Sequence, residues 1–236
     1  MRISLYRNLT FEAAHRNPHA APGSRQAGVH GHSYQARVFV EGVVDPEMGW
    51  LMDFAEIRRA CREIIDQVDH YLLNDVPGLE DASLAGVQRW LSLRLAAAIP
   101  SYSHCEVRIL GDTDLKPVVT PGSESYPGTG LQFGFAAAHF LPRVPSEHKC
   151  RRLHGHSYRV IVGASPEAMA EVDRAVRALY PTVGHCVLND IPGLENPTAE
   201  HLAQWLWERL TGDGCPIDAV TVGETCTSGC IYRGRD

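Results

Sequence analysis

Hydrophobic and polar residues alternate along two stretches near the start of the chain, 5–15 and 32–41. Alternation of this kind places every second side chain on one face and predicts two β-strands. Downstream, the spacing of apolar residues changes to three or four, which predicts an amphipathic helix. The residues of this helical stripe are Phe54, Ile57, Cys61, Ile64 and Val68. A second helix is expected to begin near Ser83, and CEVRIL at 105–110 is expected to close the unit as a strand.

Three blocks of sequence occur twice, in the same order. The pairs are FEAAH (11–15) with FAAAH (135–139), HGHSY (30–34) with HGHSY (154–158), and LLNDVPGLE (72–80) with VLNDIPGLE (187–195). The first two pairs lie 124 positions apart and the third lies 115 apart, so the second copy lacks nine residues of the turn-rich EGVVDPEMGWLMD segment. Three collinear blocks indicate a tandem duplication.

The two copies are separated by a segment rich in proline, glycine and serine, KPVVTPGSESYPGTG at 116–130. This composition is typical of a linker. We therefore predict a first unit at 1–118, a linker at 119–130 and a second unit at 131–236. Each unit is expected to be an α+β fold, an antiparallel sheet with two helices on one face.

The last helix of the second unit has its own start signal. Asn196 is expected to be the N-cap, with Pro197 at the first helical position. Four apolar residues are expected to form the buried face of this helix: Leu202, Trp205, Leu206 and Leu210.

Composition narrows the possible partners and the compartment. The 236 residues are 44% hydrophobic and 21% charged, with a net charge of −6, so neither disorder nor a basic nucleic-acid surface is expected. Arg94 interrupts the most apolar stretch, and the N-terminus has no sustained apolar region, so we expect no membrane span and no signal peptide. Seven cysteines without a paired framework favour reduced thiols and a cytoplasmic location.

The histidines are the strongest chemical signal. His154 and His156 are two positions apart on a predicted strand and point to the same face, and His139 ends a strand that can lie alongside. Three imidazoles without a fourth protein ligand would make an open, catalytic zinc site. A lone histidine is more often structural, but here a whole trio recurs at identical spacing. The first copy offers the equivalent residues His15, His30 and His32 as a second site.

Cys150 lies four residues before His154. A thiol so close to a metal is expected to have a lowered pKa and to act as a base or nucleophile. The alternatives are a fourth zinc ligand or an inert thiol. The remaining cysteines, including Cys226 and Cys230, lack a metal-binding spacing and are expected to be buried thiols.

Five motifs together carry a family resemblance: F-x-A-A-H, C-x-x-x-H-G-H, D-H-x-x-L-N-D, E-N-P-T-x-E and E-T-C-T-x-G-C-I-Y-R-G. They resemble the 6-pyruvoyl-tetrahydropterin synthase superfamily. The short C-x-x-x-H-G-H loop and the ending ETCTSGCIYRG are most similar to its queuosine-pathway branch, which forms 6-carboxy-5,6,7,8-tetrahydropterin. The resemblance implies the T-fold, whose units join edge to edge into barrels. It also implies a homo-oligomer, in which three two-unit chains could rebuild a six-unit assembly.

The resemblance further implies a reaction. Zinc would hold the side-chain hydroxyls of 7,8-dihydroneopterin triphosphate, a cysteine would move protons, and an Asp-His pair from a neighbouring unit would assist. A glutamate near the C-terminus would anchor the pterin ring. The products would be 6-carboxytetrahydropterin, acetaldehyde and triphosphate. The alternatives are a 6-pyruvoyl-tetrahydropterin synthase or folate-branch activity, or a pterin-binding protein without catalysis.

The family residues divide unevenly between the copies. The second copy matches the family pattern at the zinc trio, at Cys150, at the anchor Glu224 and at the substrate-binding positions Thr198 and Glu200. The first copy keeps the catalytic pair Asp69 and His70. The departures are Gln26 for the cysteine, Asp112 for the anchor and Ala85 for Glu200 in the first copy, and Gly184 before His185 in the second. We therefore expect one composite site, made by both copies.

Overall fold

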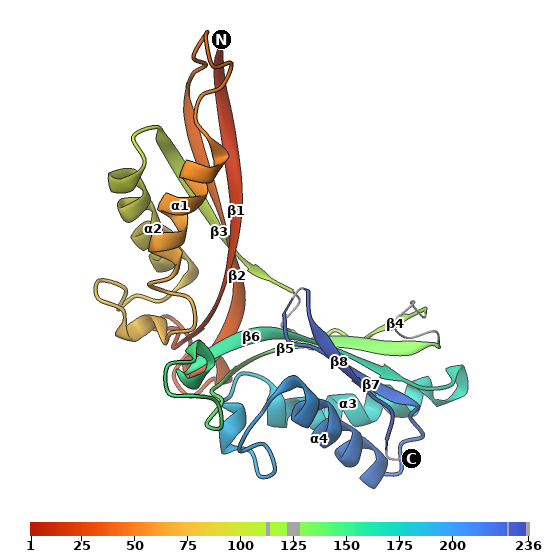
Figure 1. Cartoon of the computed structure of the whole chain (residues 1–236). Helices are drawn as coiled ribbons and strands as arrows, with labels where there is room; N and C mark the ends of the chain where they lie inside the picture. Colours follow the sequence, from red (N-terminus) through yellow and green to blue (C-terminus); the bar gives the residue numbers. More distant parts are fainter. Residues whose placement is uncertain (112–113, 122–127, 226, 235–236) are drawn as a thin grey trace.

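A computed structural model describes residues 1–111, 114–121, 128–225 and 227–234. It contains two α+β units, each an open antiparallel sheet with helices on one face (Figure 1). The first unit consists of β1 (Arg2–His15), β2 (His30–Val43), α1 (Phe54–Ile65), α2 (Leu84–Ala98) and β3 (Tyr102–Leu110). Its strand order is β1-β2-β3.

The second unit repeats this arrangement with extra strands at the edges. It consists of β4 (Val118–Thr120), β5 (Gly130–His139), β6 (His154–Gly163), α3 (Met169–Val183), α4 (Ala199–Gly212), β7 (Ala219–Gly223) and β8 (Gly229–Tyr232). The strand order is β4-β5-β6-β7-β8. β4 falls within the proline- and glycine-rich segment at 116–130. It pairs with β5 in antiparallel fashion, with Val118 opposite Gln132. Residues 122–127 of that segment lie outside the described residues.

Local signals place most helix starts. The Asp53 carboxylate accepts a hydrogen bond from the N–H of Ala55 (2.8 Å), and α1 begins there. The expected start of the last helix was wrong by two residues, because the hydroxyl of Thr198 accepts from the N–H of His201 (3.3 Å) and caps α4 instead of Asn196. Among the described residues, no helix is long and apolar enough to cross a membrane.

Each unit has its own hydrophobic core between sheet and helices. The expected stripe is buried, except that Phe54 at the first position of α1 is 50% exposed. Its last member, Val68, was wrongly placed on the helix, because α1 ends at Ile65 and Val68 lies in the turn that follows. The expected face of α4 is buried throughout. The aromatic pairs Phe11–Tyr34 and Phe135–Tyr158 stack at the same centroid distance of 4.9 Å, which shows how closely the two cores correspond.

The cysteines away from the histidines follow the expectation only in part. Cys61, Cys105 and Cys215 are buried free thiols, whereas Cys186 and Cys230 are half-buried. Cys226 lies outside the described residues. The expectation of full burial was therefore wrong for Cys186 and for Cys230, which lies on the edge strand β8.

The units meet where the HGHS blocks of β2 and β6 face each other (Figure 1). The N–H of Ser33 donates to Ser157 Oγ and the N–H of Ser157 donates to Ser33 Oγ, both at 3.2 Å. This exchange relates the copies by an approximate two-fold axis. The backbones approach so closely that a Cβ added to Gly31 would overlap the Cα of Gly155.

Gly31→Ala tests this contact. Since the added methyl would meet backbone rather than a flexible side chain, we expect the free energy of unfolding to fall by about 1–3 kcal/mol, as in overpacked cores. Gly212→Ala at the end of α4 is the matched control, because its Cβ would meet nothing within 4 Å. Urea denaturation followed by circular dichroism measures both. Equal stability of the two variants would contradict the predicted contact.

Candidate metal centre and active site

The second-copy trio converges at the contact between the units. His139 ends β5, and His154 and His156 begin β6, directly opposite it in the strand pairing. All three side chains are buried, and one ring nitrogen from each lies within 4.8 Å of the others. The fold therefore brings the three predicted ligands together.

The outward ring nitrogens fix the tautomers of two members. His139 Nδ1 lies 3.0 Å from the carbonyl oxygen of Pro197, and His154 Nδ1 lies 2.7 Å from that of Arg152. Carbonyl oxygens only accept, so each Nδ1 carries the proton and each Nε2 presents a lone pair. Those two Nε2 atoms are 3.0 Å apart. Burial lowers the pKa of His139 to about 3 and that of His154 well below its usual value, so both rings are neutral.

Two lone pairs at this distance repel unless a cation lies between them. Neutral imidazole nitrogens whose outer N–H groups are held by carbonyls or carboxylates are the usual ligands of divalent transition metals. The donor set therefore fits a divalent metal ion such as zinc.

The third ligand is oriented by the other copy. His156 Nδ1 lies 2.9 Å from Glu12 Oε2, and the same carboxylate oxygen accepts a hydrogen bond from Ser33 Oγ at 2.6 Å. Glu12 comes from β1 of the first unit and was not among the predicted site residues. Its only signal in the sequence is the difference between FEAAH and FAAAH, which puts Ala136 at the equivalent position.

The first-copy trio has a similar geometry with one difference. His15 Nε2 and His30 Nε2 are 3.1 Å apart, and their Nδ1 atoms bond to the carbonyls of Ala82 (2.8 Å) and Gly28 (2.9 Å). Within the described residues, however, the buried Nδ1 of His32 has no hydrogen-bond partner. Ala136 stands where a carboxylate would be needed, so this trio lacks one of the outer contacts that orient metal ligands.

Asp69 and His70 of the first unit lie against the second-copy trio. The ring of His70 stacks on that of His154, with centroids 4.3 Å apart, and ligand atoms of His70, Cys150 and His154 lie within 4.8 Å of one another. Asp69 Oδ1 accepts from His70 Nδ1 (2.8 Å), and Asp69 Oδ2 pairs with Lys149 Nζ (3.0 Å). The pair and the cysteine thus come from different copies of the same chain.

The charge of this pair follows from its contacts. Burial alone would raise the pKa of Asp69, but hydrogen bonds from His70, from the Glu12 N–H and from Lys149 hold it below its usual range. Burial lowers the pKa of His70, and the Asp69 carboxylate opposes that shift. His70 has φ = 61°, a conformation that non-glycine residues rarely adopt. Its N–H donates to the carbonyl oxygen of Glu12 at 2.6 Å, which holds it there.

The equivalent segment of the second copy keeps the histidine, His185, but lacks the aspartate. His185 has the same unusual backbone (φ = 55°), and its ring lies 4.8 Å from that of His30. Gly184 precedes it where Asp69 precedes His70, although the more distant charge of Asp114 opposes the lowering of the His185 pKa by burial. Arg25 donates to the Gly184 carbonyl (3.2 Å) where Lys149 meets Asp69. Gln26 occupies the short 3-10 turn that carries Cys150 in the second copy.

The acidity expected for Cys150 is not supplied by the protein. Burial raises the pKa of its thiol, and the nearby Glu224 and Asp69 raise it further, whereas Lys149 and Arg152 lower it. In the metal-free protein the net direction is upward, and the lowered pKa expected beside a bound metal stays a prediction. A metal ion bound by the trio would be the remaining source of positive charge.

Glu224 faces the same space from the end of β7. Its Oε1 lies 3.6 Å from His139 Nε2 and 3.9 Å from His156 Nε2. Burial raises the pKa of this carboxyl, while His156 opposes the shift. The predicted substrate residues Thr198 and Glu200 instead lie at the start of α4, where the Thr198 hydroxyl caps the helix and Glu200 is exposed. Asp112, the first-copy counterpart of Glu224, lies outside the described residues.

These groups enclose a cavity of about 370 Å³ between the units. Its lining includes Glu12, Asp69, His70, His139, Cys150, His154, His156 and Glu224. Positioned bases, a thiol and a metal-binding trio in one partly enclosed space are suited to proton transfer on a small, metal-bound molecule.

Comparison with known proteins agrees with this arrangement. The sequence matches the 6-pyruvoyl tetrahydropterin synthase family over residues 4–116 and again over residues 130–235. The chain belongs to this family. It carries the family domain twice, as the repeated blocks predicted.

Single-domain relatives match about half of the chain. The 6-carboxy-5,6,7,8-tetrahydropterin synthase of Synechocystis sp. is 40% identical over 116 residues, covering 43% of this chain and 88% of the relative. The dihydroneopterin monophosphate aldolase of Pyrococcus furiosus is 25% identical over 100 residues, covering 42% and 81%. The structure of Caenorhabditis elegans 6-pyruvoyl tetrahydropterin synthase covers 47% of this chain and 97% of its own, with 20% identity and a TM-score of 0.41.

Glu12→Ala tests the contact that crosses between the copies. Loss of an outer hydrogen bond to a metal-binding histidine typically weakens metal affinity about 10–100-fold, and we expect that change for Zn²⁺ at the second-copy trio. The variant is compared with Glu106→Ala, which removes an exposed carboxylate from β3. Both carry His30→Ala, so that only one trio can bind, and affinity is measured by competition with a chromogenic chelator. Equal affinities would remove Glu12 from the site.

Proposed function

We propose that this chain is a zinc-dependent carbon-carbon lyase. It converts 7,8-dihydroneopterin triphosphate to 6-carboxy-5,6,7,8-tetrahydropterin, acetaldehyde and triphosphate, as a step of queuosine biosynthesis. The observation that carries the proposal is the meeting of Asp69 and His70 of one copy with Cys150 and the histidine trio of the other. The relative from Synechocystis, whose name states this activity, supports the choice of product.

Zinc would be held by His139, His154 and His156, and when bound it supplies a Lewis acid that lowers the pKa of substrate hydroxyls. The residues around it handle protons. The Nδ1 proton of His70 is held by Asp69, so the Nε2 atom presents a lone pair that can take a proton from the substrate side chain. The thiol of Cys150 exchanges a proton at carbon once the bound cation offsets the effect of burial on its pKa.

Glu224 is proposed to anchor the pterin. A carboxylate accepts two hydrogen bonds from adjacent N–H groups of a guanidine-like edge, and charge-assisted bonds of this kind are about twice as strong as neutral ones. The raised pKa of this buried carboxyl fits a site that becomes fully charged when the donors of the ring arrive. Thr198 and Glu200 are proposed to contribute indirectly, by fixing the start of α4. Pro197, just before that helix, accepts a hydrogen bond from His139 through its carbonyl oxygen.

Each chain is proposed to contain one working site. Around the first-copy trio, Gln26 cannot transfer a proton as a thiol does, and Gly184 cannot fix the tautomer of His185.

The chains are also proposed to associate edge to edge, three of them rebuilding a six-unit assembly. The open edges of both sheets support this proposal, because an unpaired strand can pair with a strand of another chain. Light scattering on the purified protein measures this directly; a monomer would contradict it.

Incubation with 7,8-dihydroneopterin triphosphate, followed by mass identification of the product, tests the reaction. We expect 6-carboxytetrahydropterin and acetaldehyde from the wild type. His154→Ala is expected to give neither and to lose zinc at one site per chain, since a three-ligand site depends on every ligand. Formation of 6-pyruvoyltetrahydropterin, or of a pterin lacking its side chain, would replace the proposed product. No turnover of any pterin would indicate a binding protein.

Substitutions of His70 and His185, the two histidines with positive φ, test which of the two trios belongs to the working site. His70→Asn and His185→Asn are a matched pair, because asparagine tolerates positive φ and each keeps its backbone N–H bond. Loss of a positioned general base typically lowers turnover about 10²–10⁴-fold, and we expect this for His70→Asn but not for His185→Asn. Steady-state kcat with thermal melts as a folding check gives the comparison. The reverse ranking would place the working site at the first-copy trio.

A further inference from the structure

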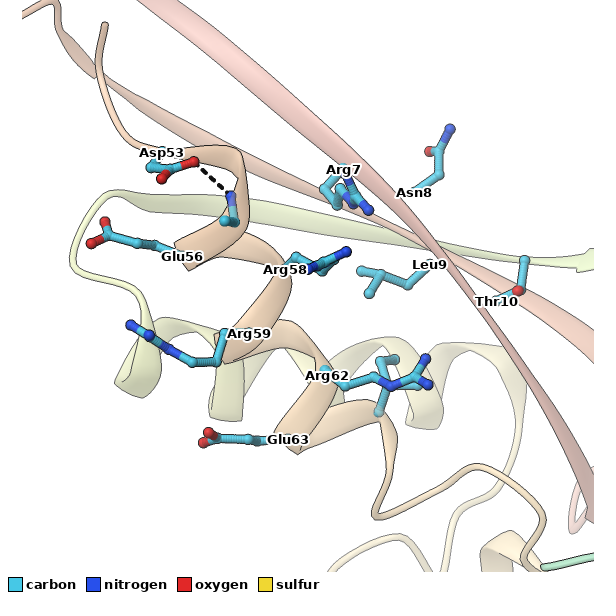
Figure 2. Close-up of a pocket in the computed structure, with 12 residues that line it drawn as sticks. Arg7, Asn8, Leu9, Thr10, Asp53, Glu56, Arg58, Arg59, Arg62 and Glu63 are labelled. Carbon is cyan, nitrogen blue, oxygen red and sulfur yellow. Dashed lines mark hydrogen bonds between the residues drawn. The ribbon is translucent and has the colours of Figure 1, made fainter. Parts of the chain in front are cut away.

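A second cavity opens beside the catalytic one, on the first unit alone. It is a groove of about 960 Å³ between β1 and α1, shown in Figure 2. Thr10 and Arg62 line both this groove and the catalytic cavity, so the two spaces are adjacent. A molecule bound beside the histidine trio can therefore extend along α1 without leaving the protein surface.

Arginines dominate the side of the groove that faces β1. Arg58 and Arg62 are four residues apart on α1 and lie on the same face, and both point toward β1 in Figure 2. Glu56, Arg59 and Glu63 project from the opposite side of the helix in the same view. The groove thus has two adjacent guanidinium groups on the side of β1, whereas Glu56 and Glu63, which also line it, lie on the other side of the helix.

These guanidinium groups are largely uncommitted. Arg62 makes only a solvent-exposed ion pair of 3.4 Å with Asp66, a kind of contact that contributes little. Arg58 has no ion pair with any other described residue. On β1, the Nε of Arg7 is buried and has no hydrogen-bond partner among the described residues. Asp53, Glu56 and Glu63 also line the groove, but among the described residues none of them forms an ion pair with these arginines. The three cationic side chains therefore remain available to an anionic ligand.

The second copy supplies an internal control for this interpretation. At the position equivalent to Arg58 stands Asp173, which pairs with Arg177, the equivalent of Arg62, at 2.8 Å. The position equivalent to Arg7 holds the buried Leu131. The second unit therefore pairs one of the equivalent cations and replaces the other two with an anion and an apolar side chain.

We propose that Arg7, Arg58 and Arg62 bind the polyphosphate tail of the substrate. The proposal rests on the proposed function for the pterin end of that substrate. Arg58 and Arg62 are separated by about 6 Å along the helix axis, one turn, which lets them contact successive phosphates of an extended chain. Guanidinium groups suit this task, because they present paired N–H donors to phosphate oxygens and stay charged at every accessible pH.

Arg58→Asp is the sharpest variant, because it copies the arrangement of the second unit and places a carboxylate one helical turn from Arg62, where it can neutralise that guanidinium. Arg177→Ala, at the position on α3 equivalent to Arg62, is the control. Isothermal titration calorimetry with inorganic triphosphate measures the groove without any reaction. Losing one charge-assisted contact and neutralising another should weaken binding at least about tenfold, whereas the control should bind as the wild type does. Unchanged affinity of Arg58→Asp would overturn the proposal.

Steady-state kinetics provides the second arm. For 7,8-dihydroneopterin triphosphate, KM of Arg58→Asp should rise by about tenfold or more, with kcat nearly unchanged, because the tail lies away from the reacting carbons. For 7,8-dihydroneopterin, which lacks phosphate, kcat/KM should be the same in variant and wild type. An equal loss with both substrates would show a structural effect and would also overturn the proposal.

The two arms separate this inference from the proposed reaction. If triphosphate binds in an Arg58-dependent manner but no carboxylated pterin forms, the groove is supported and the reaction is wrong. If the expected product forms and Arg58→Asp changes neither KM nor triphosphate affinity, the reaction is supported and the groove assignment is wrong.

Discussion

The close backbone contact between the two HGHS segments determines the rest of the structure. Gly31 and Gly155 approach more closely than any side chain would permit, and Ser33 and Ser157 exchange hydrogen bonds across the same point. Because β2 and β6 each begin with two histidines of a trio, this contact sets the two trios side by side. It also carries His70 of the first copy to the second-copy trio and His185 of the second copy to the first-copy trio.

A symmetric contact of this kind creates two sites that can diverge independently. A few substitutions at equivalent positions account for the difference between them: Glu12 against Ala136, Asp69 against Gly184, Cys150 against Gln26, and Arg58 against Asp173. In each pair, the functional group lies at the second-copy trio, and its counterpart at the first-copy trio lacks that group. The residues that carry these groups come from both copies, and therefore neither unit alone contains the proposed site.

Electrostatics explains why these groups must be close. Three buried imidazoles, a thiol whose pKa is raised by burial and the half-buried carboxyl of Glu224 would be costly to assemble without a compensating cation. A divalent metal ion relieves the opposed lone pairs of the trio and the negative charge of the carboxylates together. The arginines of the neighbouring groove differ, because Arg58 and Arg62 are solvent-exposed and stay charged without an anion. Both features indicate that the free protein is arranged for charged ligands.

Much could be predicted from the sequence alone, because the relevant signals are local. The repeat, the order of elements and the stripes of α1 and α4 follow from spacing, and His154 and His156 share a face because alternate strand residues always do. Glu12 could not be predicted, since a carboxylate at that place in a strand has meaning only when His156 of the other copy lies opposite. The direction of the Cys150 pKa and the position of the arginine groove beside the cavity likewise depend on burial and on distances between distant segments. Tertiary structure decides these features, because solvent exclusion and electrostatic interaction are set by proximity in space and not by separation along the chain.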